Sequence, residues 1–489
     1  MTARDNGSTI ALADVTTTIG TSRGELRVGR SMAHLRSLRG EITAWFDRRA
    51  NDQRFARFTG HFEILAEFLT RLLDAIEARL KKLEGEAPTS SGEAYERCRA
   101  AEQSLIIVRR TFAWYADKYE QRERDSTADA LRAGDEIVRS CWTEPFAALG
   151  RRPPSGPLAY LEPRFDAFAT PRVSLPPDLR APGDELIGNI VKELPIPTIA
   201  LPVSCPDEPW WLVLAAHETG HHIQKDLIPG LEDKTRNTLE NAVAAIAGGA
   251  ELAPAWRRWS LESFADAFSV AMVGPAAAWA VDELQYAADS RLLRVPTFDD
   301  RYPPPIVRLA LLGELGHCLS LPGAAFDAQA ALAWLDTLPA DPALNPGRAA
   351  AEPHICPTPK VAQALLDLPI DGRHSLLQVC GWDGERFADK GTAATWAAQL
   401  PRSSPVITPR AKRWSARVAI SSGVSAYMLA SAKSVINGEQ QQRLGQNLTA
   451  ILATCGEPGV LAAPSPAENV AALADRFADQ LPDAATGEH

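Results

Sequence analysis

The sequence predicts a mainly α protein with a small β-sheet, an α+β fold, and three observations support this class. Apolar residues recur three and four positions apart over long stretches towards both ends of the chain, a spacing typical of amphipathic helices. A proline-rich segment between them keeps no helical period and contains one short apolar run with the composition of a strand. With 489 residues, the chain is long enough for two or three domains and a sizeable core.

Residues 27–150 are predicted to form an N-terminal helical bundle that follows a flexible N-terminus, residues 1–26. Four helical patterns with short breaks between them favour an antiparallel bundle, because a short connection returns the chain beside the helix it leaves. The apolar stripe of the second pattern is interpreted as bundle core, and His34 and His61 as ordinary surface or core residues. The patterns lie near residues 27–50, 52–85, 92–123 and 127–149, and the stripe contains Phe62, Leu65, Phe68, Leu69, Leu72, Leu73, Ile76 and Leu80.

Frequent prolines mark residues 151–205 as a linker with short extended segments. The apolar run at residues 196–204 resembles one strand interrupted by prolines. Because proline cannot donate to a sheet ladder, we predict that this strand lies at an edge of the sheet. A plain connecting loop is the alternative.

Residues 217–221 read His-Glu-Thr-Gly-His. On a helix, His217 and His221 share a face and Glu218 flanks them, whereas His222 points ~100° away. The preceding residues, 209–216, are almost wholly apolar, so the helix is predicted to be buried. Two buried imidazoles can hold zinc, and the adjacent carboxylate can take a proton from a water molecule that the metal activates. The alternative, a solvent-facing helix with two surface histidines, is disfavoured by the apolar flank.

A second apolar helix, residues 259–268, offers a third ligand. Glu262 and Asp266 are four residues apart on one face, where two carboxylates repel each other unless a cation lies nearby. With Glu262 as ligand, zinc keeps one position open for water, and Asp266 can accept the free N–H of a ligand histidine. The alternative is an ordinary amphipathic helix whose polar stripe includes both acids.

His-Glu-x-x-His followed by Glu-x-x-Ala-Asp on a later helix resembles the gluzincin metallopeptidases. The HtpX-like and CAAX-prenyl-protease-like zinc peptidases also carry His-Pro and then Arg, six residues after that His. Here Tyr302-Pro303 precedes Arg308 with the same spacing, with Tyr in place of His. A phenol can donate a hydrogen bond to an oxyanion as an imidazole can.

This resemblance covers roughly residues 190–320 and implies a zincin-like catalytic core, placed here within residues 151–340. It implies an edge strand before the metal helix, with which an extended substrate pairs through its backbone. It also implies a role for seven residues: His217, His221 and Glu262 as zinc ligands, Glu218 as general base, Asp266 behind a ligand, and Tyr302 and Arg308 near the substrate carbonyl.

The rest of the chain is predicted to be a helical C-terminal region, residues 341–482, and a disordered tail, residues 483–489. His317, His354 and His374 lack partners at metal-ligand spacing and are interpreted as structural or surface residues. From residue 303 onwards, across the end of the core and the C-terminal region, helical patterns lie near residues 303–321, 325–337, 358–368, 409–434, 437–454 and 466–480.

Composition bounds the cellular context. A formal net charge of −10 argues against a nucleic-acid partner, which calls for a basic face. Seven scattered cysteines form no Cys-x-x-Cys pair, which fits a reducing compartment. The sequence shows neither a signal-peptide pattern nor ~18 consecutive apolar residues, so we expect a cytoplasmic protein with no membrane partner.

Together these patterns predict a zinc-dependent metallopeptidase with a protein or peptide substrate, in which Glu218 serves as general base. Two alternatives stay open: a zinc-stabilised binding or scaffold protein that processes nothing, and a zinc hydrolase of a non-peptide amide. The presence of Glu218 favours the enzymes, because a purely structural zinc site has no use for a general base.

Overall fold

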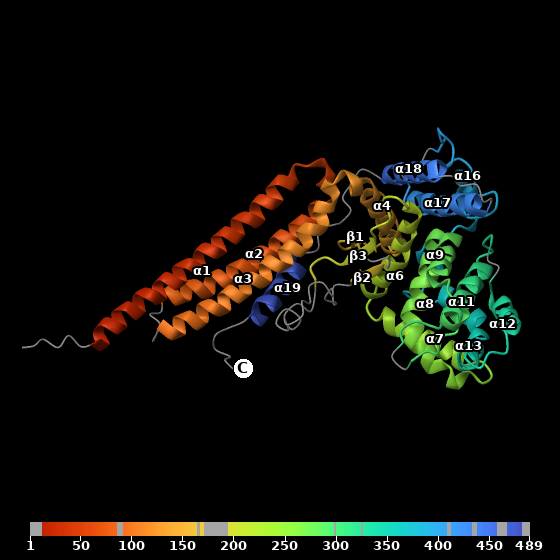
Figure 1. Cartoon of the computed structure of the whole chain (residues 1–489), viewed down its shortest axis with the longest axis horizontal. Coiled ribbons are helices and arrows are strands. Elements are labelled where there is room, and N and C mark those ends of the chain that lie inside the picture. Colours follow the sequence, from red (N-terminus) through yellow and green to blue (C-terminus); the bar gives the residue numbers. More distant parts are fainter. Residues whose placement is uncertain are drawn as a thin grey trace, which may run out of the picture. The chain divides into compact units, whose positions relative to one another are not determined.

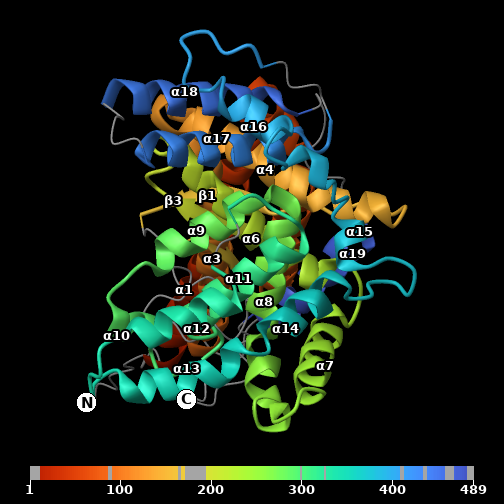
Figure 2. The ribbon, with the colours of Figure 1, turned by 90° about the vertical axis from the view of Figure 1, so that its right-hand side faces the viewer.

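The computed structural model confirms a mainly α protein with one small sheet (Figures 1 and 2). It describes residues 12–85, 91–163, 167–170, 194–297, 300–323, 326–407, 412–432, 438–456 and 467–481. The chain divides into two compact units, here unit 1 and unit 2, and the predicted tail at 483–489 lies outside the described residues. None of the described helices is long and apolar enough to cross a membrane.

Unit 1 is built from long helices, with α2 packed against α1 and α19 (Figure 1). The ring of Trp45 meets Phe62 and Phe112 edge to face, which joins α1 to α2 and α3. Every residue of the predicted apolar stripe is buried, as predicted. The elements are α1 (Leu12–Ala50), the 3₁₀ helix η1 (Gln53–Phe58), α2 (Thr59–Gly85), α3 (Ser91–Glu120), whose last residues belong to unit 2, and α19 (Ala467–Gln480).

Two predictions about this part of the chain need correction. Residues 12–26, predicted as flexible, belong to α1. The fourth predicted bundle helix is α4 (Asp125–Ala148), and it belongs to unit 2, where it packs against α6 and α18. α4 belongs to unit 2 because its apolar face is part of that unit's hydrophobic core, which includes Leu131, Ile137 and Trp142.

Unit 2 contains the sheet, whose strand order is β1-β3-β2. The strands are β1 (Leu158–Glu162), β2 (Phe168–Thr170) and β3 (Thr198–Pro202). β3 pairs parallel with β1 and antiparallel with β2, so the prediction that it is an edge strand is wrong. Pro197 precedes the strand and Pro202 is its last residue, which leaves the backbone N–H groups between them free to join the ladders.

α8 is the central helix of unit 2 and is in contact with α6, α7, α9 and α11 (Figure 2). Helices before and after residue 340 share one core, so the predicted division there has no counterpart in the two units. After β3 come the 3₁₀ helix η3 (Pro209–Val213), α6 (Leu214–Asp226), α7 (Leu231–Ala244), η4 (Gly249–Glu251), α8 (Ala253–Val273), α9 (Pro275–Gln285), α10 (Asp289–Leu292), α11 (Pro305–Cys318), α12 (Ala328–Thr337), α13 (Asn345–Ile355), α14 (Thr358–Leu366), α15 (Leu376–Val379), η5 (Gly384–Arg386), α16 (Thr392–Ala397), α17 (Ser415–Ala432) and α18 (Gly438–Thr454).

Candidate metal centre

The two helices that carry the predicted ligands, α6 and α8, cross at very close range. Gly220 lies at the crossing, and a Cβ atom there would come within 3.1 Å of both the Cα atom of Ala265 and the ring of Phe268. Gly220, directly before His221, therefore lets the backbones of the two helices approach. This approach brings the side chains of both helices to one point.

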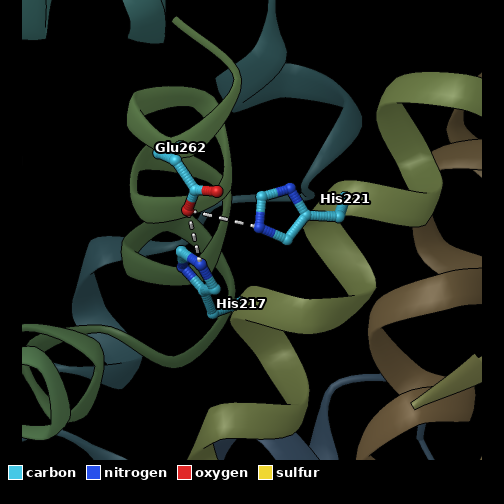
Figure 3. Close-up of side chains that lie close together, drawn as sticks. All are labelled: His217, His221 and Glu262. Carbon is cyan, nitrogen blue, oxygen red and sulfur yellow. Dashed lines mark ion pairs between the residues drawn. The ribbon is translucent and has the colours of Figure 1, made fainter. Parts of the chain in front are cut away.

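His217, His221 and Glu262 meet at that point (Figure 3). Oε2 of Glu262 lies 3.5 Å from Nε2 of His217 and 3.4 Å from Nε2 of His221. The three ligand atoms lie within 4.8 Å of one another, and no other group of three metal-ligating side chains occurs in the described part of the chain. Oε2 of Glu262 is buried and makes no hydrogen bond with a described residue. Buried polar atoms usually have a partner, and a bound cation would satisfy this one. The three residues therefore fit a metal ion.

Burial and neighbouring charges act in opposite directions on these groups. Burial lowers the pKa of His217, but the carboxylates of Asp266 and Glu262 outweigh it and raise that pKa to about 10. Burial raises the pKa of Glu262, whereas the two imidazoles hold it well below its usual range. Both shifts arise because a buried carboxylate requires positive charge beside it. A divalent cation would supply that charge and leave the histidines as neutral ligands.

Asp266 is in contact with His217. Its Oδ1 is 3.0 Å from Nδ1 of His217, and its side chain is fully buried. Burial raises the pKa of Asp266, but the Arg308 guanidinium and His217 outweigh it and hold the pKa below its usual value. When Nδ1 of His217 carries the proton, it can donate a hydrogen bond to the ionised Asp266, and Nε2 keeps the lone pair that binds a metal.

Arg308 is paired with Asp266. Its Nε and one terminal nitrogen donate to the two oxygens of Asp266, at 2.8 and 2.7 Å, and the residue is buried on α11. A guanidinium forms its strongest hydrogen bonds with a carboxylate, and here that carboxylate is Asp266. The place of Arg308 near a substrate carbonyl stays a prediction.

Tyr302 lies beside the ligands, just before α11. Its side chain is half-exposed, and its ring centroid is 5.5 Å from the Arg308 guanidinium. Burial, and then the charge of Glu262, raises the pKa of Tyr302. The hydroxyl therefore keeps its proton at neutral pH and is available as a hydrogen-bond donor.

Glu218 is buried next to the centre but is not one of the three clustered ligands. Burial raises its pKa, and the two histidines oppose this only in part. The backbone N–H of Ala169 lowers this pKa slightly as well. Ala169 is in β2, an outer strand of the sheet of described residues, and β2 packs against α6, the helix that carries Glu218.

Sequence reasoning missed β2 and the close contact at Gly220. β2 has only three residues within a proline-rich segment, too few for a period-2 pattern, whereas the glycine inside the His-Glu-x-x-His segment was a usable signal of close helix packing. The other histidines lie elsewhere: His222 contacts the backbone oxygen of Thr198, His354 packs against Trp259, and His374 contacts Asp371.

Comparison of the chain with protein-family models, with curated proteins and with solved structures found no match. The interpretation of the centre therefore rests on its geometry and its chemistry.

Proposed function

We propose that the protein is a zinc-dependent metallopeptidase that hydrolyses peptide bonds. The observation that supports it most is the convergence of His217, His221 and Glu262 beside Glu218, a buried carboxylate outside the ligand set. A purely structural zinc site is closed by four protein ligands, whereas a catalytic site has three and one open position. Two nitrogens and one oxygen form a donor set that suits zinc.

The chain's own residues supply the rest of the chemistry. When bound, zinc would polarise the scissile carbonyl and lower the pKa of a water molecule towards about 7. Glu218 would take a proton from the attacking water and pass it to the leaving amine; its raised pKa makes it a better proton acceptor near neutral pH. Tyr302 would donate its proton in a hydrogen bond to the developing oxyanion.

A peptide is the proposed substrate because a sheet edge packs against α6, the helix that carries Glu218. A substrate in extended conformation can pair with an outer strand through its backbone, and β2 presents such an edge beside the helix of the general base. Pairing of this kind recognises a run of peptide groups, which a small amide lacks. The role that the sequence suggested for the strand preceding the metal helix is thus transferred from β3 to β2.

The order of the motifs leads us to propose a gluzincin relationship as well. His-Glu-x-x-His on α6 supplies two ligands and the base, and Glu-x-x-Ala-Asp on α8 supplies the third ligand and its outer partner. Tyr302 stands where the related peptidases have His, and Arg308 supports Asp266.

Elemental analysis of the purified full-length chain tests the metal. We expect one zinc per chain, and depleted zinc in His217→Ala, His221→Ala and Glu262→Ala. His222→Gln is the matched control, because this neighbouring buried histidine contacts Thr198 and not the centre. Full zinc occupancy in all three ligand variants would refute the site.

A cleavage assay on a peptide library from digested cell proteins tests the reaction. Glu218→Gln should keep its zinc and lose cleavage, whereas Glu240→Gln, a change in a surface ion pair with Arg257, should keep both. Equal cleavage by Glu218→Gln and the wild type contradicts the role of Glu218. A wild type that holds zinc and cleaves nothing favours the zinc-stabilised binding protein, and one that cleaves only small amides favours the other hydrolase.

A further inference from the structure

Unit 2 also contains a cavity, here the apolar cavity, with a volume of about 800 Å³. Its described wall comes from α8, α9, α10, α11, α12, α16 and α17 and from connections between them, and it includes none of the residues of the candidate metal centre. The rings of Trp279, Trp334 and Phe387 are part of this wall. The volume falls in the range of small-molecule sites, about 300–1,000 Å³.

The apolar cavity extends from the core of unit 2 to its surface. Val270, Ile306 and Leu312 line it and are buried members of the hydrophobic core. Met428 and Leu429 of α17 line it too, but they are 45% and 59% exposed. A single exposed apolar side chain is common on protein surfaces, whereas these two border an apolar recess. The cavity therefore opens to solvent between apolar side chains, which gives an apolar molecule a way in.

The wall of the apolar cavity offers few polar groups to a ligand. Besides the two indole nitrogens, Ser421 and Ser425 are the polar side chains of its described lining that are buried or half-buried. The Oγ atom of Ser421 has almost no accessible surface, so it is closed to a ligand. A peptide or another strongly polar molecule would lose hydrogen bonds to water that this wall does not replace. The wall therefore favours a ligand with few polar groups.

The charges of the lining disfavour an anion. Asp282 and Asp389 are exposed lining residues, and the described lining includes no lysine, arginine or histidine. A carboxylate or sulfonate in the cavity would lose water without gaining a cation beside it. Because the two aspartates are exposed, their carboxylates stay hydrated and do not require a cationic ligand. The charges therefore favour an uncharged ligand.

We propose that the apolar cavity binds an uncharged, largely apolar small molecule that packs against the aromatic rings of the wall. The volume suits a small molecule, the apolar wall continues to the surface, and the lining has neither the hydrogen-bonding groups for a peptide nor the cation for an anion. The inference is independent of the proposed function, because no ligand or base of the metal centre lines this cavity.

Two fluorescent probes with the same ring skeleton test the class of ligand on the full-length chain. Phenylnaphthylamine is uncharged, and anilinonaphthalene sulfonate adds one sulfonate to the same rings. Fluorescence titration should show saturable binding of the uncharged probe and about tenfold or more weaker binding of the sulfonate, because the sulfonate is dehydrated without a partner. No saturable binding of the uncharged probe, or equal binding of the sulfonate, would overturn the proposal.

Variants that fill the cavity test where the probe binds. Ala278→Phe on α9 and Ser425→Leu on α17 each add apolar volume at a half-buried position of the wall, and each should weaken the uncharged probe about tenfold. Ala350→Phe is the matched control, because Ala350 is half-buried on α13 and outside the wall. Melting curves verify that the variants fold. Wild-type affinity in a folded wall variant would overturn the proposal.

A pair of surface variants tests the same site without any change in the core. Asp282→Lys replaces an exposed acid of the lining with a cation, so it should tighten binding of the sulfonate about two- to fivefold and narrow the preference for the uncharged probe. Glu283→Lys makes the same change of charge at the next residue, which is exposed and outside the wall, and should have a smaller effect. Equal effects of the two variants would place the probes elsewhere and overturn the proposal.

Discussion

Arg308 donates two hydrogen bonds to the carboxylate of Asp266, at 2.8 and 2.7 Å. Oδ1 of Asp266 in turn lies 3.0 Å from Nδ1 of His217. The three side chains come from α11, α8 and α6, so a series of contacts connects three helices and ends at His217, a candidate metal ligand. Arg308 thus belongs to the support of the centre.

This pair predicts a large effect of Arg308→Met. The variant leaves the buried carboxylate of Asp266 without its main cation, so the free energy of unfolding should fall by about 3–5 kcal/mol. Zinc affinity should weaken about 10–100-fold, because His217 loses its oriented partner. Urea unfolding of metal-free protein and competition with a chelator measure the two effects.

Arg257→Met is the control for that variant. Arg257 pairs with Glu240 on the surface, where such a pair contributes about 0–1 kcal/mol. If Arg308→Met binds zinc as tightly as the wild type, the contact of Arg308 with Asp266 does not affect metal binding.

Tyr302→Phe should lower the rate of cleavage without removing zinc. If the hydroxyl holds the oxyanion, loss of this one donor should slow a single turnover by about 10²–10³-fold. Zinc content and melting temperature should not change, because the half-exposed ring stays and the hydroxyl is no ligand. A near-equal rate would assign oxyanion stabilisation to zinc alone.

Gly220→Ala should separate the two helices of the centre. The added Cβ would lie 3.1 Å from the Cα of Ala265, so α6 or α8 must shift by a few tenths of an ångström. We expect a loss of about 1–3 kcal/mol in unfolding free energy and a weaker zinc site, both measured as for Arg308→Met. Gly29→Ala is the control, since a Cβ there meets nothing within 4 Å and should stabilise α1 by about 0.5–1 kcal/mol. Equal effects of the two changes would contradict the close crossing.

His354 predicts a pH dependence of stability that is separate from the metal centre. Burial beside Trp259 lowers its pKa from 6.5 to about 4. Between these values the unfolded chain binds a proton that the folded chain does not, so the unfolding free energy should fall as the pH falls from 6.5 to 4. Above pH 6.5, His354 is neutral in both states and does not reduce the unfolding free energy. Below a pH of about 4 it is protonated in both states, and its effect on the unfolding free energy stops growing.

His354→Phe should remove that part of the pH dependence and keep an aromatic ring against Trp259. Urea unfolding of both proteins across the same pH range isolates the contribution, because all other titrating groups are shared. Parallel curves would show that His354 is protonated to the same extent in both states.

Sequence patterns predicted most helices and singled out the three clustered side chains, because both depend on spacing along one helix. The step of four residues puts His217 beside His221 and Glu262 near Asp266 whatever the rest of the chain does. The closeness of the two pairs depends on the crossing of α6 and α8, and only the structure shows it.

The features that escaped prediction depend on contacts between distant segments. α4 has the same helical period as its predecessors, and nothing local reveals that its partners, α6 and α18, come much later in the chain. From the sequence alone, Arg308 could pair with an oxyanion or a carboxylate equally well, and the fold places Asp266 opposite it. The prolines near β3 argued against a central strand because the sequence does not show where the strand begins and ends. In the structure they lie just before the strand and at its last residue, where they do not interrupt the ladder.

A metal bound at the junction of α6, α8 and α11 would also stabilise the folded chain. An ion held by residues from two of these helices binds the native chain and not the unfolded one, so it shifts the equilibrium towards the native state. At a free zinc concentration one hundred times the dissociation constant, this adds about 2.7 kcal/mol. The melting temperature of the full chain should therefore rise with free zinc and fall with a chelator, which gives a measure of site occupancy that requires no substrate.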